Sequence, residues 1–243
     1  MERTESLWDG GPCFCYGGDA FPPSTDTFLL GYFTRTKRGE RICDLGAGTG
    51  LLGVLLLARQ PELTVTAVEY RESGCQAIRH AAACNGWEAR LIPAPFDLRR
   101  PEQFSAAGAF DAVVANPPYF AEGRGAVSPK AARQAARAEV SCTLEDVFRA
   151  AAWLLKSAGR FSLVMRPERM AEVFALADRF HLAPKRMRTV QFRPGSPPSL
   201  FLLECRKDGG AGLTLEAPLY LQNEAGRDTE EYARIYFRAR QEG

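Results

Sequence analysis

The sequence predicts one α/β domain built on a mostly parallel sheet, and two observations lead to that prediction. Short apolar runs alternate with helical stretches through most of the chain, which is the pattern of repeated strand–helix–strand units. The chain has 243 residues, of which 46% are hydrophobic and 25% charged, so it is long enough for one domain with a substantial core. We expect a seven-stranded sheet with helices on both faces and no second full domain.

The predicted elements follow a Gly- and Pro-rich lead-in of about twenty residues. Strands are expected near 41–44, 64–69, 89–92, 112–115, 160–165, 185–192 and 199–206. Helices are expected at 50–59, 72–85, 144–157 and 170–180. Gly159 is the expected stop of the third helix. Because residues 193–198 are rich in Pro and Gly, the last two strands are predicted to form an antiparallel pair.

The segment Asn116-Pro117-Pro118-Tyr119 is the most informative feature of the chain. It follows the apolar run 110–115, which indicates a buried strand ending at a rigid turn. Prolines lack a backbone N–H, so the Asn116 side-chain oxygen and the carbonyls of Asn116 and Pro117 can act as acceptors. Tyr119 adds a ring for stacking. Such acceptors beside a ring are what methylation of the N6 amine of adenine requires, although the four residues alone also fit a stiff loop.

A glycine-rich turn follows the first predicted strand, in Asp44-Leu45-Gly46-Ala47-Gly48-Thr49-Gly50. Glycines let the backbone pass close to a ligand, and the following helix N-terminus offers unpaired N–H groups. Asp44 lies at the strand tip, where a carboxylate would repel a pyrophosphate but would suit a cationic sulfonium with an ammonium group. The turn therefore favours S-adenosylmethionine over NAD as the cofactor, with Gly46, Gly48 and Gly50 as contacts.

Two further acidic residues end predicted strands on the same side of the sheet. Glu69 ends the second strand about twenty residues after the glycine turn, which is the usual distance for a carboxylate that binds a ribose diol. Asp97 follows the third strand, where it could accept a hydrogen bond from the adenine amino group of the cofactor. Either residue could instead be a solvated charge at a strand end.

In this order and spacing, the Asp44 turn, Glu69, Asp97 and the Asn116 tetrapeptide resemble the class I S-adenosylmethionine-dependent methyltransferases that act on amines. Three further segments resemble the bacterial family of tRNA(Val) adenine-37-N6-methyltransferases. They are residues 24–31 (Ser-Thr-Asp-Thr-Phe-Leu-Leu-Gly), residues 133–139, and Leu213-Thr214-Leu215 with Thr229-Glu230-Glu231-Tyr232, which is similar to that family's closing hairpin and helix.

The resemblance covers residues 13–236 and implies a Rossmann-like class I methyltransferase fold. It also implies N6 methylation of an adenine in RNA, most directly tRNA, with Asp26 near the methionine end of the cofactor. We expect a lead-in at 1–30 that contacts the cofactor, a cofactor-binding domain at 31–207, and a C-terminal extension of that domain at 208–243. The family's aromatic N-terminal hairpin appears here only as the short segment 13–18.

Net charge is only +2, so a nucleic-acid surface must come from local clusters of basic residues. Lys130, Arg133 and Arg137 fall at helical spacing after Tyr119 and can share one face, and Phe120 lies beside that tyrosine. These residues are the predicted RNA contacts. A second cluster, formed by Lys185, Arg186, Arg188 and Arg193, could also bind phosphates, although either cluster fits a solvated surface as well.

The remaining composition favours a reducing compartment. Seven cysteines show no Cys-x-x-Cys spacing, and with only two histidines we expect no metal site. The cysteines are typical of small buried residues in a reducing cytoplasm. No apolar leader and no long uncharged stretch is visible, so we expect no membrane segment, a cytoplasmic location and, by default, a monomer.

The mechanism that these residues suggest uses acceptors rather than a general base. The Asn116 Oδ1 and the Pro117 carbonyl would accept the two N–H bonds of the target amine, while Tyr119 stacks on the flipped base. Three other functions stay open from the residues alone. The same acceptors fit a protein glutamine N5-methyltransferase or a guanine N2 RNA methyltransferase, and a non-catalytic binding module is the third. The basic residues after Tyr119 favour RNA.

Overall fold

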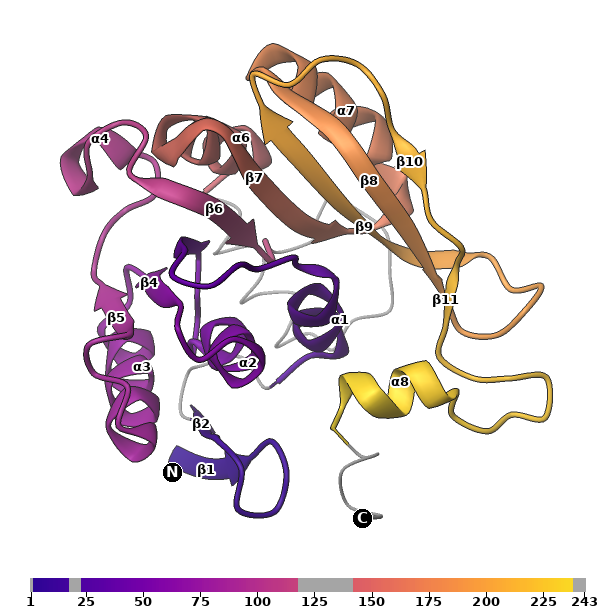
Figure 1. Ribbon diagram of the computed structural model, residues 1–243, viewed down its shortest axis with the longest axis horizontal. Coiled ribbons are helices and arrows are strands. Elements are labelled where there is room, and N and C mark those ends of the chain that lie inside the picture. The colour runs from indigo at the N-terminus through magenta and orange to yellow at the C-terminus, as the bar shows by residue number, and fades with distance from the viewer. Residues whose placement is uncertain (1, 18–22, 118–141, 238–243) are drawn as a thin grey trace.

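The computed structural model describes residues 2–17, 23–117 and 142–237. Within these ranges the chain forms a nine-stranded sheet and a separate two-stranded hairpin (Figure 1). No helix of the described ranges is long and apolar enough to cross a membrane.

Seven strands form the predicted sheet, in the order β5-β4-β3-β6-β7-β9-β8. Their bounds are β3 Arg41–Leu45, β4 Thr64–Val68, β5 Leu91–Ala94, β6 Phe110–Ala115, β7 Leu155–Met165, β8 Leu182–Gln191 and β9 Pro198–Lys207. Strand β9 is antiparallel to both of its neighbours and the other pairs are parallel, so the predicted antiparallel pair is confirmed. Two short strands, β10 Thr214–Leu215 and β11 Leu219–Tyr220, are added beside β8.

Helices cover both faces of the sheet, as predicted (Figure 1). One face packs against α1 (Thr25–Phe33), α2 (Leu51–Arg59) and α3 (Glu72–Asn85), whose leucines and alanines share one core cluster with that face. The other face packs against α6 (Leu144–Leu154) and α7 (Met170–Arg179), with the short α4 (Pro101–Phe104) beside them. The buried strands are apolar on both sides because helices exclude water from both faces.

The boundary between α6 and β7 differs from the prediction. The helix ends at Leu154 rather than Ser157, and β7 begins at once with Leu155, which is buried and pairs with Phe110. Gly159 therefore lies inside the strand, after an irregularity in the register. A Cβ at Gly159 would lie 2.8 Å from the Lys156 carbonyl oxygen, so the glycine serves a close backbone approach rather than a helix stop.

The N-terminal lead-in is also more regular than predicted. Strands β1 (Glu2–Ser6) and β2 (Cys13–Gly17) form an antiparallel hairpin. The side chain of Asn85, at the end of α3, holds this hairpin through hydrogen bonds to the backbone N–H and carbonyl of Cys13, both 2.8 Å long.

The C-terminal part does not form the closing hairpin that the resemblance implied. Strands β10 and β11 both run parallel to β8. The expected helix is present as α8 (Glu230–Ile235), which begins after the N-cap Thr229 and packs near α1 (Figure 1). Helix α8 therefore contacts α1, although the two are far apart in the sequence.

Candidate active site

Three of the predicted site residues meet at one edge of the sheet. Asp44 pairs in register with Ala67 of β4 on one side and with Val114 of β6 on the other. Glu69 and Asn116 each follow two residues after those partners. The carboxyl ends of neighbouring parallel strands thus bring Asp44, Glu69 and Asn116 together, at the place where ligands bind in open α/β sheets.

The glycine turn between β3 and α2 is shaped by backbone conformation. Gly46, Gly48 and Gly50 have φ values of +71°, +58° and +78°, which other residues rarely adopt. A Cβ at Gly46 or Gly48 would meet no atom within 4 Å, so neither glycine is required by close packing. At Gly50, by contrast, a Cβ would lie 2.7 Å from Cγ1 of Ile78. The first two glycines therefore leave open space beside the backbone.

Asp44 is a buried carboxylate, with only 2% of its surface exposed. Its Oδ2 atom has no hydrogen-bond partner among the described residues. Burial, and secondly the nearby charge of Glu69, raises the pKa of Asp44 to about 7. Burying a carboxylate oxygen without a hydrogen-bond donor costs free energy. A cation or a donor that approaches Asp44 would therefore be bound favourably.

Glu69 is equally buried, at 3% exposure, but its carboxylate has several donors. The Gly48 N–H donates to Oε2 at 2.9 Å, and the backbone N–H and Nε of Arg71 donate to Oε1 at 2.9 Å each. These bonds connect the second strand tip directly to the glycine turn and hold its backbone in place.

Gly74 is a supporting residue that sequence reasoning missed. It lies in the first turn of α3, where a Cβ would come within 2.6 Å of both the Glu69 Cγ and the Gly48 carbonyl oxygen. The helix can approach the turn this closely only without a side chain at that position. A glycine in the first turn of a predicted helix was the available signal.

Asp97 differs from the two buried carboxylates, since it is partly exposed and forms an ion pair with Arg99. Arg99 donates from Nε to both carboxylate oxygens, at 2.9 and 2.8 Å, and this bonding lowers the pKa of Asp97. Its suggested contact with the adenine of the cofactor stays a prediction.

Asn116 is held by a helix that begins far from it in the sequence. Its Nδ2 donates to the Thr27 hydroxyl at 2.9 Å. Thr27 lies in the first turn of α1, where its hydroxyl is 3.0 Å from that of the N-cap Ser24. Asp26 lies in the same turn and is partly buried. This bond ties the Asn116 carboxamide to the first turn of α1. Pro117 follows and is buried.

Helix α1 is held in turn by α8. The Tyr236 hydroxyl donates to the Thr25 hydroxyl at 2.9 Å, and the Tyr236 ring stacks on Phe28 with centroids 4.3 Å apart. Thr27 and Tyr236 were not predicted as site residues. The N-cap pattern of residues 24–27 was a signal for the helix, but nothing local in the sequence connects Thr25 with Tyr236.

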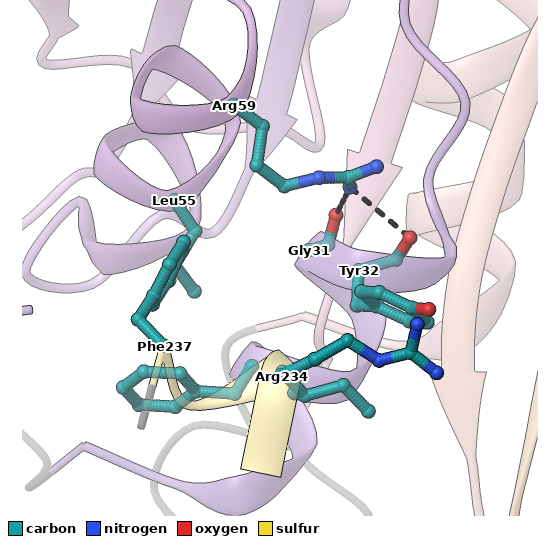
Figure 2. A pocket seen from close by; sticks show the side chains of 8 residues that line it. Gly31, Tyr32, Leu55, Arg59, Arg234 and Phe237 are labelled. Carbon is teal, nitrogen blue, oxygen red and sulfur yellow. Dashed lines mark hydrogen bonds between the residues drawn. The ribbon is translucent and has the colours of Figure 1, made fainter. Parts of the chain in front are cut away.

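A cavity of about 370 Å³ separates α1, α2 and α8, and no predicted site residue lines it. Its lining residues are Phe28, Gly31, Tyr32, Leu55, Arg59, Arg234, Ile235 and Phe237 (Figure 2). Arg59 donates to the carbonyls of Gly31 and Tyr32, and to that of Thr34 at 3.3 Å. This arginine therefore caps the C-terminal end of α1 (Figure 2). Asn116 is bound at the other end of the same helix.

The predicted substrate residues Tyr119, Phe120, Lys130, Arg133 and Arg137 lie outside the described residues. The second basic cluster is dispersed in the structure. Arg186 is buried between Glu204 and Glu216, at 3.1 and 2.6 Å, and Arg188 pairs with Glu231. These two arginines have structural partners, so the cluster does not act as one surface.

The known proteins that this sequence resembles are methyltransferases. A family model described as the methyltransferase small domain matches residues 20–193. A tRNA1(Val) (adenine(37)-N6)-methyltransferase of Bacteroides thetaiotaomicron is 30% identical over 185 residues, which are 76% of each chain. The protein of the same name from Tolumonas auensis is 31% identical over 185 residues, again 76% of each chain.

Solved structures share the fold. A predicted O-methyltransferase from Agrobacterium tumefaciens superposes with a TM-score of 0.73, at 25% identity over 88% of this chain and 96% of that one. The T. thermophilus 16S rRNA N2 G1207 methyltransferase, solved with AdoMet and guanosine, has a TM-score of 0.59 at 20% identity, over 85% of this chain and 50% of that one. The latter likeness concerns the fold alone.

Proposed function

The chain belongs to the methyltransferase small-domain family, and from that premise we propose that it transfers a methyl group from S-adenosylmethionine to the N6 amine of an adenine in tRNA. The observation that carries the proposal is the Asn116 carboxamide, anchored by Thr27, at the same sheet edge as the buried Asp44. The relatives named as tRNA adenine-37-N6-methyltransferases support the choice of substrate.

The residues present fit this cofactor. The buried Oδ2 of Asp44 has no donor among the described residues, so a ligand with an ammonium and a sulfonium group would supply the missing charge. Gly46 and Gly48 leave space beside the backbone. We assign the ribose to Glu69, the adenine of the cofactor to Asp97 and the methionine end to Asp26 together with Asp44. When bound, the cofactor supplies an activated methyl group on a positively charged sulfur.

The chain's own contribution is to make the amine a better nucleophile and to position it. The lone pair of an adenine amine is delocalised into the ring. Acceptors at the Asn116 Oδ1 and the Pro117 carbonyl would bind its two N–H groups and favour a pyramidal nitrogen with a localised lone pair. The Nδ2 bond to Thr27 keeps the carboxamide in that orientation. No general base is needed before transfer, because positioning provides most of the acceleration.

The substrate residues complete the proposal. Tyr119 stacks on the flipped adenine with Phe120 beside it, and Lys130, Arg133 and Arg137 bind phosphates of the RNA. We also propose that the protein acts as a monomer in the cytoplasm. All seven cysteines are described and are free thiols, which supports a reducing compartment.

The test is methyl transfer from labelled S-adenosylmethionine to bulk tRNA taken from a strain that lacks this gene. Nucleoside digestion and mass spectrometry are expected to show N6-methyladenosine in one tRNA. Label in N2-methylguanosine would move the reaction to another base. Label found only in protein, as methylglutamine, would replace RNA as the substrate while leaving the acceptor chemistry of Asn116 in place.

A further inference from the structure

We propose that the turn between β8 and β9 is a second contact for the RNA substrate, in which Phe192 stacks on an unpaired base and Arg193 binds a backbone phosphate. The inference rests on the proposed function, because it takes RNA as the substrate. It adds a surface far from the Asn116 segment in the sequence.

The turn lies at the same edge of the sheet as Asn116. Strands β6 and β7 are parallel, and β9 is antiparallel to both β7 and β8, so β8 runs in the direction of β6. Its carboxyl end, and the turn that follows, therefore emerge beside the site. Three strand spacings separate β6 from β8, or about 14 Å at about 4.8 Å each. Ala115 lies level with Met187 in the register of the sheet, so Phe192 stands about four residues, or about 13 Å, beyond the level of Asn116 along the strands. A stacked strand of nucleic acid covers the combined distance of about 19 Å with about six nucleotides.

Phe192 is far more exposed than other phenylalanines of the sheet. The side chain is 52% exposed, whereas Phe201 on the adjoining strand β9 and Phe161 on β7, the strand beyond it, are fully buried. Arg193 is exposed too, and its guanidinium has no ion pair among the described residues. Arg186 and Arg188 of the same strand differ, since both bind carboxylates. The turn between β8 and β9 thus presents an exposed aromatic ring and an exposed cation that are not needed to hold the fold.

The backbone of this tip is held firmly. The Ser196 hydroxyl accepts from the Arg193 N–H at 3.1 Å and donates to the Arg193 carbonyl at 2.6 Å. Gly195 has a φ of +82°, and prolines stand at 194 and 197. On the other side, the Gln222 N–H donates to the Phe192 carbonyl at 2.8 Å. Since the ring and the cation stand on an ordered turn, binding would require little loss of backbone entropy.

A second turn lies beside the first. Residues 223–228 follow β11 and close with a bridge between Gln222 and Asp228. Both turns protrude on the same side of the molecule, near α8 (Figure 1). Arg227 is exposed there without an ion pair among the described residues, but Glu224 and Asp228 stand close to it in the sequence. Arg193 is therefore expected to bind phosphate more strongly than Arg227.

This combination fits single-stranded RNA. A stacking ring beside a cation recognises an unpaired base and its phosphate, which a loop offers and a regular duplex does not. The occupant we propose is therefore the stretch of tRNA loop about six nucleotides from the target adenine.

The test measures tRNA binding as a function of salt, with cofactor affinity and methyl transfer measured in parallel. Phe192→Ala is expected to raise the tRNA dissociation constant about tenfold. Arg193→Gln is expected to raise it severalfold and to lower the salt slope of binding by about one. Lys37→Gln is the matched control, because Lys37 is an exposed cation at the opposite edge, before β3. Cofactor affinity and thermal unfolding should stay unchanged in all three variants.

The two proposals fail differently. If the unaltered protein methylates tRNA while Phe192→Ala and Arg193→Gln bind it with unaltered affinity and salt slope, the second contact is overturned and the proposed function stands. An equal loss of affinity in Lys37→Gln would also overturn it, since general charge would then explain the effect. If the unaltered protein neither binds nor methylates RNA, the proposed function is overturned.

Discussion

The cofactor half and the acceptor half of the site are built in different ways. In the cofactor half, Gly48 binds Glu69 across 21 residues, within one strand–helix–strand unit. In the acceptor half, Asn116 binds Thr27 across 89 residues, and Thr25 binds Tyr236 across 211. The first half is a local motif whose parts arrive together, whereas the second depends on helices from both ends of the chain. The following substitutions test whether the cofactor half governs cofactor binding and the acceptor half governs turnover.

The largest effect is expected at Asn116. Asn116→Ala removes the proposed acceptor, so turnover should fall by about 100- to 1000-fold, the range for loss of one preorganised group at a reacting centre. Cofactor affinity should stay within about threefold, because Asp44 and Glu69 are untouched. Single-turnover kinetics and calorimetry measure the two quantities. Unaltered turnover would remove the proposed mechanism.

Asp44 should control cofactor binding and its pH dependence. Its pKa of about 7 means that much of the free protein carries a protonated carboxyl below neutral pH, while a cationic ligand favours the carboxylate. Affinity should therefore weaken by up to about tenfold for each pH unit below 7, and binding near pH 6.5 should release a proton. Calorimetry in buffers of different ionisation enthalpy measures that release.

Asp44→Asn is the matched variant. It should weaken cofactor binding about 10- to 100-fold and abolish the proton release. The free protein should gain stability above pH 7, because a carboxyl with a raised pKa favours the folded state at low pH and loses that contribution as pH rises towards 7. Thermal unfolding at pH 5 and pH 8 checks this sign. A pH-independent affinity in the unaltered protein would contradict the assignment.

Thr27 should affect turnover without affecting cofactor binding. Thr27→Val keeps the shape but leaves the Asn116 Nδ2 without its acceptor, so kcat is expected to fall about tenfold. Thr27→Ser restores a hydroxyl and should recover most of that loss. A comparison of kcat, KM and cofactor dissociation constant separates positioning from binding. An equal loss in the serine variant would indicate a packing role instead.

The smallest effect is expected at Tyr236. Tyr236→Phe retains the stacking on Phe28 and loses only the hydrogen bond to Thr25, so kcat should fall about two- to threefold. The thermal midpoint should move little. A loss as large as that of Thr27→Val would show that the hydroxyl, rather than the stacked ring, sets the position of α1.

Local features of the structure were predicted from the sequence, whereas contacts between distant elements were not. The seven strands, the antiparallel pair and the meeting of Asp44, Glu69 and Asn116 were predicted, because hydrophobic runs, turn residues and strand tips are local features. Thr27, Gly74 and Tyr236 were not predicted as site residues. Their roles arise from contacts between elements, and only Gly74 had a local signal, as a glycine in the first turn of a predicted helix.

The errors at element boundaries have similar causes. The helix α6 was predicted to continue to Ser157, because Lys156 and Ser157 are compatible with a helix, but Leu155 is buried by pairing with Phe110. Tertiary pairing overrode a weak local preference. No strand was predicted in the Gly- and Pro-rich lead-in, whereas hydrogen bonds from Asn85 of α3 hold a hairpin there.

The hydrogen bond between Thr25 and Tyr236 also orders events during protein synthesis. Helix α1 is translated early, but the residue that fixes its first turn follows 211 residues later. At the usual rate of about 5 to 20 residues per second, roughly 10 to 40 s pass between the two. A nascent chain can thus form the contact between Gly48 and Glu69 well before Tyr236 fixes the first turn of α1, which carries both Asp26 and Thr27, so the site is completed only late in synthesis.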